Sequence, residues 1–135
     1  MKYPLNVGDS FTITDTNGTH LNFIVADADS SPNTGGMIML LYMSSSTGVY
    51  KDPTTIIKFG EHPFVDQKKE ESWIKYQNPL FFTRNELDDL VVDYYGPISE
   101  ELLTRIQTGI KSSILCAKRD KKTFNEWHQD RLLRN

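Results

Sequence analysis

At 135 residues, with 38% hydrophobic and 24% charged side chains, the chain is typical of a single globular domain, and its longest apolar run, residues 37–43, is far shorter than the about 20 residues that span a bilayer. The net charge is −3 and is unevenly distributed. Residues 1–117 are acidic, with nine Lys and Arg against fifteen Asp and Glu, and residues 118–135 are basic, with six Lys and Arg against three Asp and Glu. This distribution excludes the broad basic surface of a non-specific nucleic-acid binder. The single cysteine, Cys116, excludes an internal disulfide and a cysteine-based zinc site. Because no apolar signal segment follows Met1, we expect a cytoplasmic protein.

The first elements form a predicted hairpin. Phe11 and Ile13 alternate with polar residues in 10–14, which predicts a half-buried strand. Asn17-Gly18 is a dipeptide that favours a tight hairpin turn, so residues 21–26 are expected to return as the second strand.

The central strand is expected next. Residues 27–36 are rich in Asp, Ser, Pro and Gly and predict a loop, and the apolar run 37–43 that follows predicts a strand buried on both faces. A buried helix is the alternative for this run. The β-branched residues of 54–59 predict another strand.

Two short extended runs, 61–65 and 72–77, are expected on either side of a polar loop, 66–71. The second run alternates as a strand does. This alternation places Ser72, Ile74 and Tyr76 on one face and Trp73, Lys75 and Gln77 on the other. A cation, an amide and an aromatic ring on one strand face suit a phosphate or a nucleotide, although an edge strand with one solvated face has the same pattern.

A short strand at 80–82 is expected to lead into a helix over 83–90. Thr83 and Glu86 have the spacing of a capping box, in which each side chain accepts a hydrogen bond from the other residue's backbone N–H.

The end of the chain reads as a strand followed by a helix. Residues 91–95 predict a last strand, and Ser99 is expected to cap a helix. The apolar positions recur at helical spacing on one face of this helix: Leu102, Leu103, Ile106, Ile110, Ile114 and Ala117. Gly109 in its middle is expected to mark close packing. Residues 118–135 are expected to be a basic tail that folding does not require, either a short helix or a segment that orders on a partner.

The predicted elements define the fold class. About six or seven short strands linked in close succession, with a closing helix, favour a mainly β (α+β) domain over residues 1–117, built as a small SH3-like barrel.

This order of elements resembles the MazF/PemK (Kid) toxin superfamily over roughly residues 6–116. The matching pieces are Val7-Gly8-Asp9 before the first strand, the apolar strand that ends in hydroxyls (39–47), the late pattern 73–77 followed by Phe81-Phe82-Thr83, and the closing helix. The resemblance implies a homodimeric toxin that cleaves single-stranded RNA without a metal or cofactor and is held silent by a cognate antitoxin protein.

RNA cleavage without a metal needs a base, an acid and a group that stabilises the phosphorane. We predict catalytic roles for His62, Lys75 and Gln77, because histidine titrates near neutral pH and a lysine can hold a phosphate as a point charge. A histidine packed beside Pro63 and a solvated strand lysine are the structural alternatives.

Further residues are predicted to bind the RNA. Hydroxyls donate to phosphate oxygens and an indole stacks on a base. The predicted substrate-binding residues are His20, Ser44, Ser45, Ser46, Thr47 and Trp73. The alternatives are an exposed hairpin residue for His20, a flexible loop for 44–47 and a dimer interface for Trp73.

The sequence departs from the family pattern at one position, and this departure gives a second possible function. The family's usual arginine just before the second strand is absent here, where residues 18–21 read Gly-Thr-His-Leu and no arginine precedes Arg84. The alternative is therefore a catalytically inactive relative that uses the same groove as a binding or regulatory module.

Overall fold

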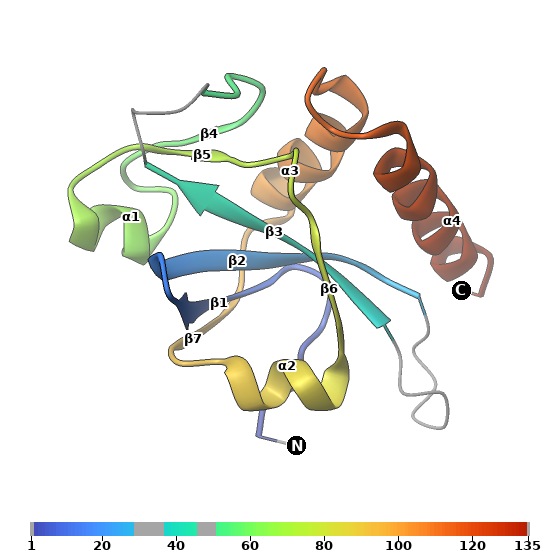
Figure 1. Ribbon diagram of the computed structural model, residues 1–135, viewed down its shortest axis with the longest axis horizontal. Helices are drawn as coiled ribbons and strands as arrows, with labels where there is room; N and C mark the ends of the chain where they lie inside the picture. Colours follow the sequence, from blue (N-terminus) through green and yellow to red (C-terminus); the bar gives the residue numbers. More distant parts are fainter. Residues whose placement is uncertain (1, 29–36, 46–50, 135) are drawn as a thin grey trace.

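The computed structural model describes residues 2–28, 37–45 and 51–134, with side chains up to residue 128. Its strands are β1 (Asp9–Asp15), β2 (Gly18–Asp27), β3 (Met37–Ser44), β4 (Ile56–Ile57), β5 (Ser72–Ile74), β6 (Leu80–Thr83) and β7 (Tyr94–Pro97). Its helices are α1 (Pro63–Lys68), α2 (Arg84–Leu90), α3 (Glu100–Ser112) and α4 (Lys118–Arg134). Figure 1 shows the strands at the centre with helices around them. Within this range, no helix has both the length and the apolar character needed to cross a membrane.

The strands form one curled antiparallel sheet in the order β4-β5-β3-β2-β1-β7, with β6 also paired to β3. The predicted α+β class is therefore confirmed. The sheet is a half-barrel with β4 and β7 at its two ends, rather than the closed barrel that the short strands suggested.

β3 is the central strand, as its apolar sequence predicts, and the helical alternative is wrong. It pairs with β2 along one side, and on the other side with β6 through Met37–Leu40 and with β5 through Met43 and Ser44. Residues 38–41 are buried because neighbours cover both edges and both faces of the strand.

Both predicted helix caps are confirmed. Thr83 and Glu86 form the capping box of α2, and the Ser99 side chain accepts a hydrogen bond from the Leu102 N–H at the start of α3. The predicted strand over 61–65 is wrong, because Pro63 begins α1 and His62 caps it. Proline at the first helical position was the overlooked signal.

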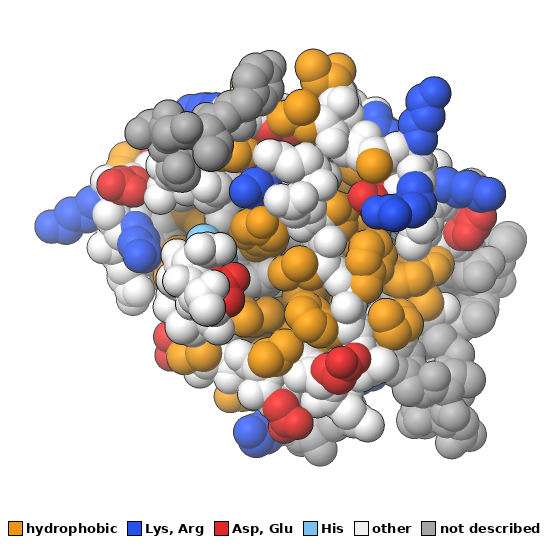
Figure 2. Space-filling model, viewed as in Figure 1, with side chains coloured by type: hydrophobic (Ala, Val, Ile, Leu, Met, Phe, Trp, Pro, Cys, Tyr) orange, Lys and Arg blue, Asp and Glu red, His pale blue; other side chains and the backbone are white. Residues whose placement is uncertain are grey.

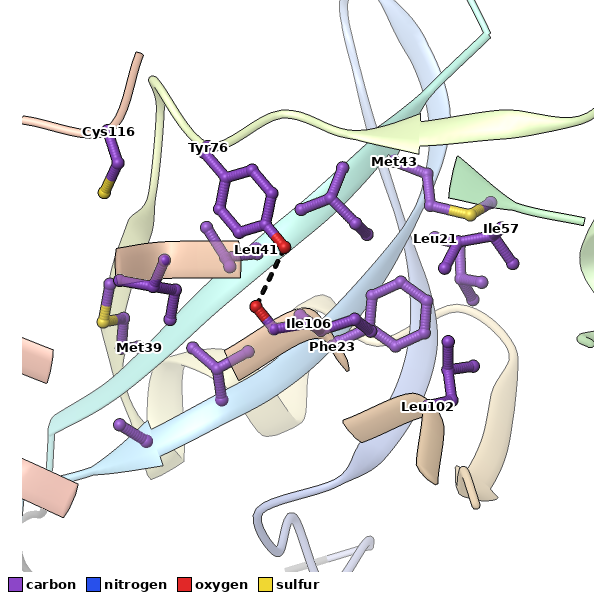
Figure 3. Packing of buried hydrophobic residues seen from close by; sticks show 14 of the residues in the cluster. Leu21, Phe23, Met39, Leu41, Met43, Ile57, Tyr76, Leu102, Ile106 and Cys116 are labelled. Atoms are coloured by element: carbon purple, nitrogen blue, oxygen red, sulfur yellow. Dashed lines mark hydrogen bonds between the residues drawn. The ribbon is translucent and has the colours of Figure 1, made fainter. Parts of the chain in front are cut away.

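Two apolar clusters lie on opposite faces of the sheet. The first lies between the sheet and the helices α3 and α4, and includes Phe23, Leu41 and Ile106. The second includes Leu40 and lies toward the N-terminal segment and α2. In the first cluster the Tyr76 hydroxyl donates to the Ile106 backbone oxygen at 2.8 Å, which ties the sheet side to α3 (Figure 3).

The C-terminal segment belongs to the domain and is not a separate tail. α4 contacts β2, and the Phe124 side chain is buried in the first cluster. Trp127 meets Phe81 edge to face, with the ring centroids 5.7 Å apart. The spacing of apolar residues missed this docking because only one face of a polar helix makes the contacts.

We therefore expect Phe124→Ala to destabilise the domain by about 3–5 kcal/mol, the usual cost of emptying a buried aromatic site. The exposed neighbour provides a matched control: Asn125→Ala should leave stability unchanged or slightly raised. Urea unfolding followed by circular dichroism measures both. Equal stability of Phe124→Ala and the unmodified protein would mean that α4 is dispensable, as the sequence first suggested.

Candidate functional site

His62, the first predicted catalytic residue, lies inside the domain. Its side chain is 3% exposed, and the rings of Phe23 and Tyr95 lie edge-on against it. Its Nδ1 accepts a hydrogen bond from the Phe64 N–H at 3.0 Å and so caps α1. Its Nε2 lies 2.9 Å from Oγ of Ser10.

These contacts fix the protonation state of the ring. The Ser10 hydroxyl donates to the Gly96 backbone oxygen at 3.0 Å, so it accepts from Nε2 of His62. Nδ1 then carries no proton, as its bond from Phe64 requires. Burial lowers the pKa of His62 from 6.5 to about 4, and the nearby Asp66 carboxylate offsets only part of this effect. The structure thus gives His62 the structural role of a neutral helix cap.

This burial makes folding pH-dependent. Between pH 6.5 and pH 4, the unfolded chain binds a proton at His62 and the folded chain does not, so stability should fall by about 3 kcal/mol as the pH drops through this window. Urea unfolding at a series of pH values measures the loss. The difference in stability between the unmodified protein and His62→Gln isolates the contribution of His62, because the acidic residues titrate in the same way in both proteins. Parallel pH profiles for the two proteins would contradict the assignment.

Two of the predicted residues, His20 and Lys75, meet around a third that the sequence did not single out, Tyr42. The His20 and Tyr42 ring centroids are 5.5 Å apart, and Nζ of Lys75 lies 5.9 Å from the Tyr42 centroid. We call these three residues the Tyr42 patch. They come from β2, from β3 and from the position directly after β5.

Strand alternation explains why the Tyr42 patch forms. Each of its residues has a neighbour in the sequence that points into the cluster under α3 and α4, namely Leu21, Leu41, Met43, Ile74 and Tyr76. Side chains alternate across a strand, so the patch residues lie on the other face. The Lys75 N–H donates to the Tyr42 backbone oxygen at 3.0 Å, which continues the β5 pairing and sets the two side chains together.

The patch is partly open to solvent and has a carboxylate beside it. The His20 side chain is 29% exposed, and its Nε2 lies 3.9 Å from the Asp15 carboxylate on the β1–β2 hairpin. Lys75 and Tyr42 are half-buried. Beside them, Asn22 is buried with its amide oxygen unpaired among the described residues, while its amide nitrogen donates to the His20 backbone oxygen.

The other predicted binding residues do not all reach this patch. Trp73 is 2% exposed, so it cannot stack on a base as predicted. It pairs across strands with Ser44 and Ile56 and is part of the interior. Ser44 ends β3 next to this pair, and Ser45 follows it exposed. The predicted residues Ser46 and Thr47 lie outside the described part of the chain.

Gln77, the third predicted catalytic residue, is half-buried two positions after Lys75. Its side-chain oxygen is buried without a hydrogen-bond partner among the described residues. The structure shows no contact between it and His20 or Tyr42 in this part of the chain. Of the predicted set, His20 and Lys75 meet around Tyr42, and Ser44 pairs with the buried Trp73 across β3 and β5.

Two arginines that could have replaced the missing one are held elsewhere. Arg84 forms an ion pair with Asp27 and donates to the Leu5 backbone oxygen at 2.7 Å. Arg105 forms an ion pair with Glu61. Among the described residues, no group of three or more His, Cys, Asp or Glu side chains is placed to hold a metal ion.

Comparison with known proteins adds no relative: no family model, no curated protein and no solved structure gives a significant match to this chain.

Proposed function

We propose that the protein is a cytoplasmic toxin of the PemK/MazF kind that binds single-stranded RNA at the Tyr42 patch and cleaves it without a metal. The observation that carries this proposal is the convergence of His20, Tyr42 and Lys75 from three separate segments onto one partly exposed part of the sheet. The family resemblance of the sequence supplies the substrate class.

The patch has the chemistry that single-stranded RNA needs. Aromatic and imidazole rings offer surfaces on which an unpaired base stacks. The Lys75 ammonium, next to the Tyr42 ring, is a point charge for the adjoining phosphate. A local cation within an acidic body suits one or two phosphates and not a long duplex.

For cleavage, His20 replaces His62 as the base, because His20 is the partly exposed imidazole and His62 is buried. Neutral His20 takes the proton of the 2′-hydroxyl, the 2′-oxygen bonds to phosphorus, and the bond to the 5′-oxygen breaks, with solvent protonating the leaving oxygen. Lys75 stabilises the added negative charge on the phosphorane. The products are a 2′,3′-cyclic phosphate and a 5′-hydroxyl.

A second candidate is RNA binding without cleavage. The burial of His62 favours this candidate. Cleavage needs one group that accepts a proton and one that donates a proton, and with His62 buried the Tyr42 patch holds a single imidazole for both. The structural engagement of Arg84 and Arg105 favours it further.

A homodimer and a cognate antitoxin belong to the same proposal. A dimer interface was the alternative role for Trp73, but Trp73 is buried in the interior. What supports a partner surface instead is the gathering of hydrophobic side chains over β3 and β6 on the face drawn in Figure 2, with charged groups around it.

The test is incubation of the purified protein with end-labelled single-stranded RNA in EDTA, with both binding and product ends measured. Cleavage that yields 2′,3′-cyclic phosphate ends supports the toxin. Binding without cleavage selects the second candidate. If the protein neither binds nor cleaves a panel of RNAs of varied sequence, both candidates are wrong.

A further inference from the structure

A hollow that shares no residue with the Tyr42 patch lies between α3 and the segment 53–58 that contains β4. Its volume is about 490 Å³, within the range of small-ligand sites. Hydroxyl groups and two cations, Lys58 and Arg105, line it. Gly109 forms part of its wall, where α3 approaches the buried Tyr76.

Some of the hydroxyl groups that line this hollow already form hydrogen bonds within the protein, and others do not. Thr54 donates to the Asp52 carboxylate at 2.5 Å, and the Thr55 hydroxyl lies 2.7 Å from that of Tyr76. In contrast, the hydroxyls of Thr104 and Thr108 have no hydrogen-bond partner within the part of the chain that the structure describes. They lie four residues apart, on one face of α3.

The guanidinium group of Arg105 is held in a fixed position beside these hydroxyls. It donates to the Ile56 backbone oxygen at 2.7 Å and is paired with the Glu61 carboxylate. Its side chain remains 35% exposed, so the group still faces the hollow. Little side-chain entropy is lost when a positioned cation of this kind meets a ligand.

The charges around the hollow favour an anion of small size. Lys58 and Arg105 are both cationic. Glu61 is paired with Arg105, accepts a hydrogen bond from the Lys58 N–H and lies close enough to feel the Lys58 charge. Asp52 accepts hydrogen bonds from Thr54 and, at 2.6 Å, from the Ser113 hydroxyl. The donors without a hydrogen-bond partner among the described residues are therefore the Lys58 ammonium, the open edge of the Arg105 guanidinium and two hydroxyls. Phosphate oxygens are the acceptors that such a mixed set of donors binds best.

We propose that this hollow is a binding site for a phosphate group, held by Lys58, Arg105, Thr104 and Thr108. The proposal does not depend on RNA cleavage or on the Tyr42 patch. The phosphate comes either free, on a mononucleotide, or as the 5′-phosphate of an RNA chain.

The test is a titration of the ¹⁵N-labelled protein followed by NMR, at ionic strength matched with chloride so that screening stays constant. The probes are inorganic phosphate, adenosine 5′-monophosphate, and an oligoribonucleotide with and without a 5′-phosphate. We expect saturable shifts of the amide signals of residues 104–109, with a Kd of about 1 mM for the free ion.

Two variants and one control decide the site. Lys58→Ala should weaken binding about tenfold or more, and Thr108→Val by a smaller factor, because each removes one donor. Lys111→Ala, on the same helix but outside the hollow, should bind as the unmodified protein does. Arg105 is left intact because its removal would leave Glu61 without its partner.

The four probes show which kind of phosphate-bearing molecule the site binds. Binding of the free ion and of every 5′-phosphate shows a site for the phosphate group itself, while binding of the phosphorylated oligoribonucleotide alone shows a site for an RNA end. Shifts that do not saturate, that lie outside residues 53–58 and 104–112, or that persist unchanged in Lys58→Ala would overturn the proposal. Either result is independent of whether the protein cleaves RNA.

Discussion

Replacing His20 by Asn is expected to slow RNA cleavage by about 10²–10⁴, the usual contribution of one general base. The change should leave the fold intact, since the His20 side chain is partly exposed near the start of β2 and its ring contact is with Tyr42 and its ionic contact with Asp15. Single-turnover cleavage of a labelled RNA measures the rate, and circular dichroism checks the fold.

His128 offers the matched control, because it is another histidine in contact with an aromatic ring, Phe124, but lies on α4. His128→Asn should cleave at the rate of the unmodified protein. An equal rate in His20→Asn would remove His20 from the mechanism. A similar loss in both variants would point to a general effect of losing an imidazole and not to the Tyr42 patch.

The second large effect concerns stability. A Cβ atom added at Gly109 would lie 2.0 Å from the Tyr76 hydroxyl oxygen and 2.8 Å from Oγ of Thr55. Tyr76 is fully buried and donates to the Ile106 backbone oxygen, so it cannot move aside without losing that bond. Alanine would gain about 1 kcal/mol of helix propensity, but overpacking and the lost hydrogen bonds should outweigh it, for a net loss of about 2–4 kcal/mol.

Chemical denaturation of Gly109→Ala measures this loss. Thr108→Ala is the control, since the neighbouring position is exposed and tests helix propensity without the clash. A Gly109→Ala variant that is more stable than the unmodified protein would show that helix propensity decides and that Tyr76 does not pack as described.

The fold was largely predictable because local signals and burial agree in most of the chain. The first strand, the Asn17-Gly18 turn and the capping box of Thr83 and Glu86 each appear in the structure as predicted. The first strand is not half-buried, however, because Ser10 and Thr12 are buried together with Phe11. The prediction failed at α1, where Pro63 was read as part of an extended run, and at α4, where one buried aromatic residue decides the docking. Docking through one buried residue produces no repeated spacing of apolar residues, so the sequence pattern does not show it.

The candidate site was only half predictable for a related reason. His20 and Lys75 were identified by their chemistry, and strand alternation placed Lys75 on the correct face. Tyr42 was hidden in an apolar run, where nothing local separates an outward-facing residue from the buried ones beside it. Burial of His62 and Trp73 depends on which strands become neighbours, and the sequence does not reveal that pairing.

The most direct test of the Tyr42 patch compares two lysines that make the same kind of contact. Nζ of Lys75 lies 5.9 Å from the centroid of Tyr42, and Nζ of Lys68 lies 5.5 Å from the centroid of Phe64 on α1. Each substitution to Ala removes one positive charge and one cation–π contact, so the global charge change is the same. Fluorescence anisotropy with a labelled single-stranded RNA measures the affinity of both variants. We predict that Lys75→Ala weakens binding about tenfold while Lys68→Ala binds as the unmodified protein does. Equal affinities of the two variants would contradict the assignment of RNA binding to the Tyr42 patch.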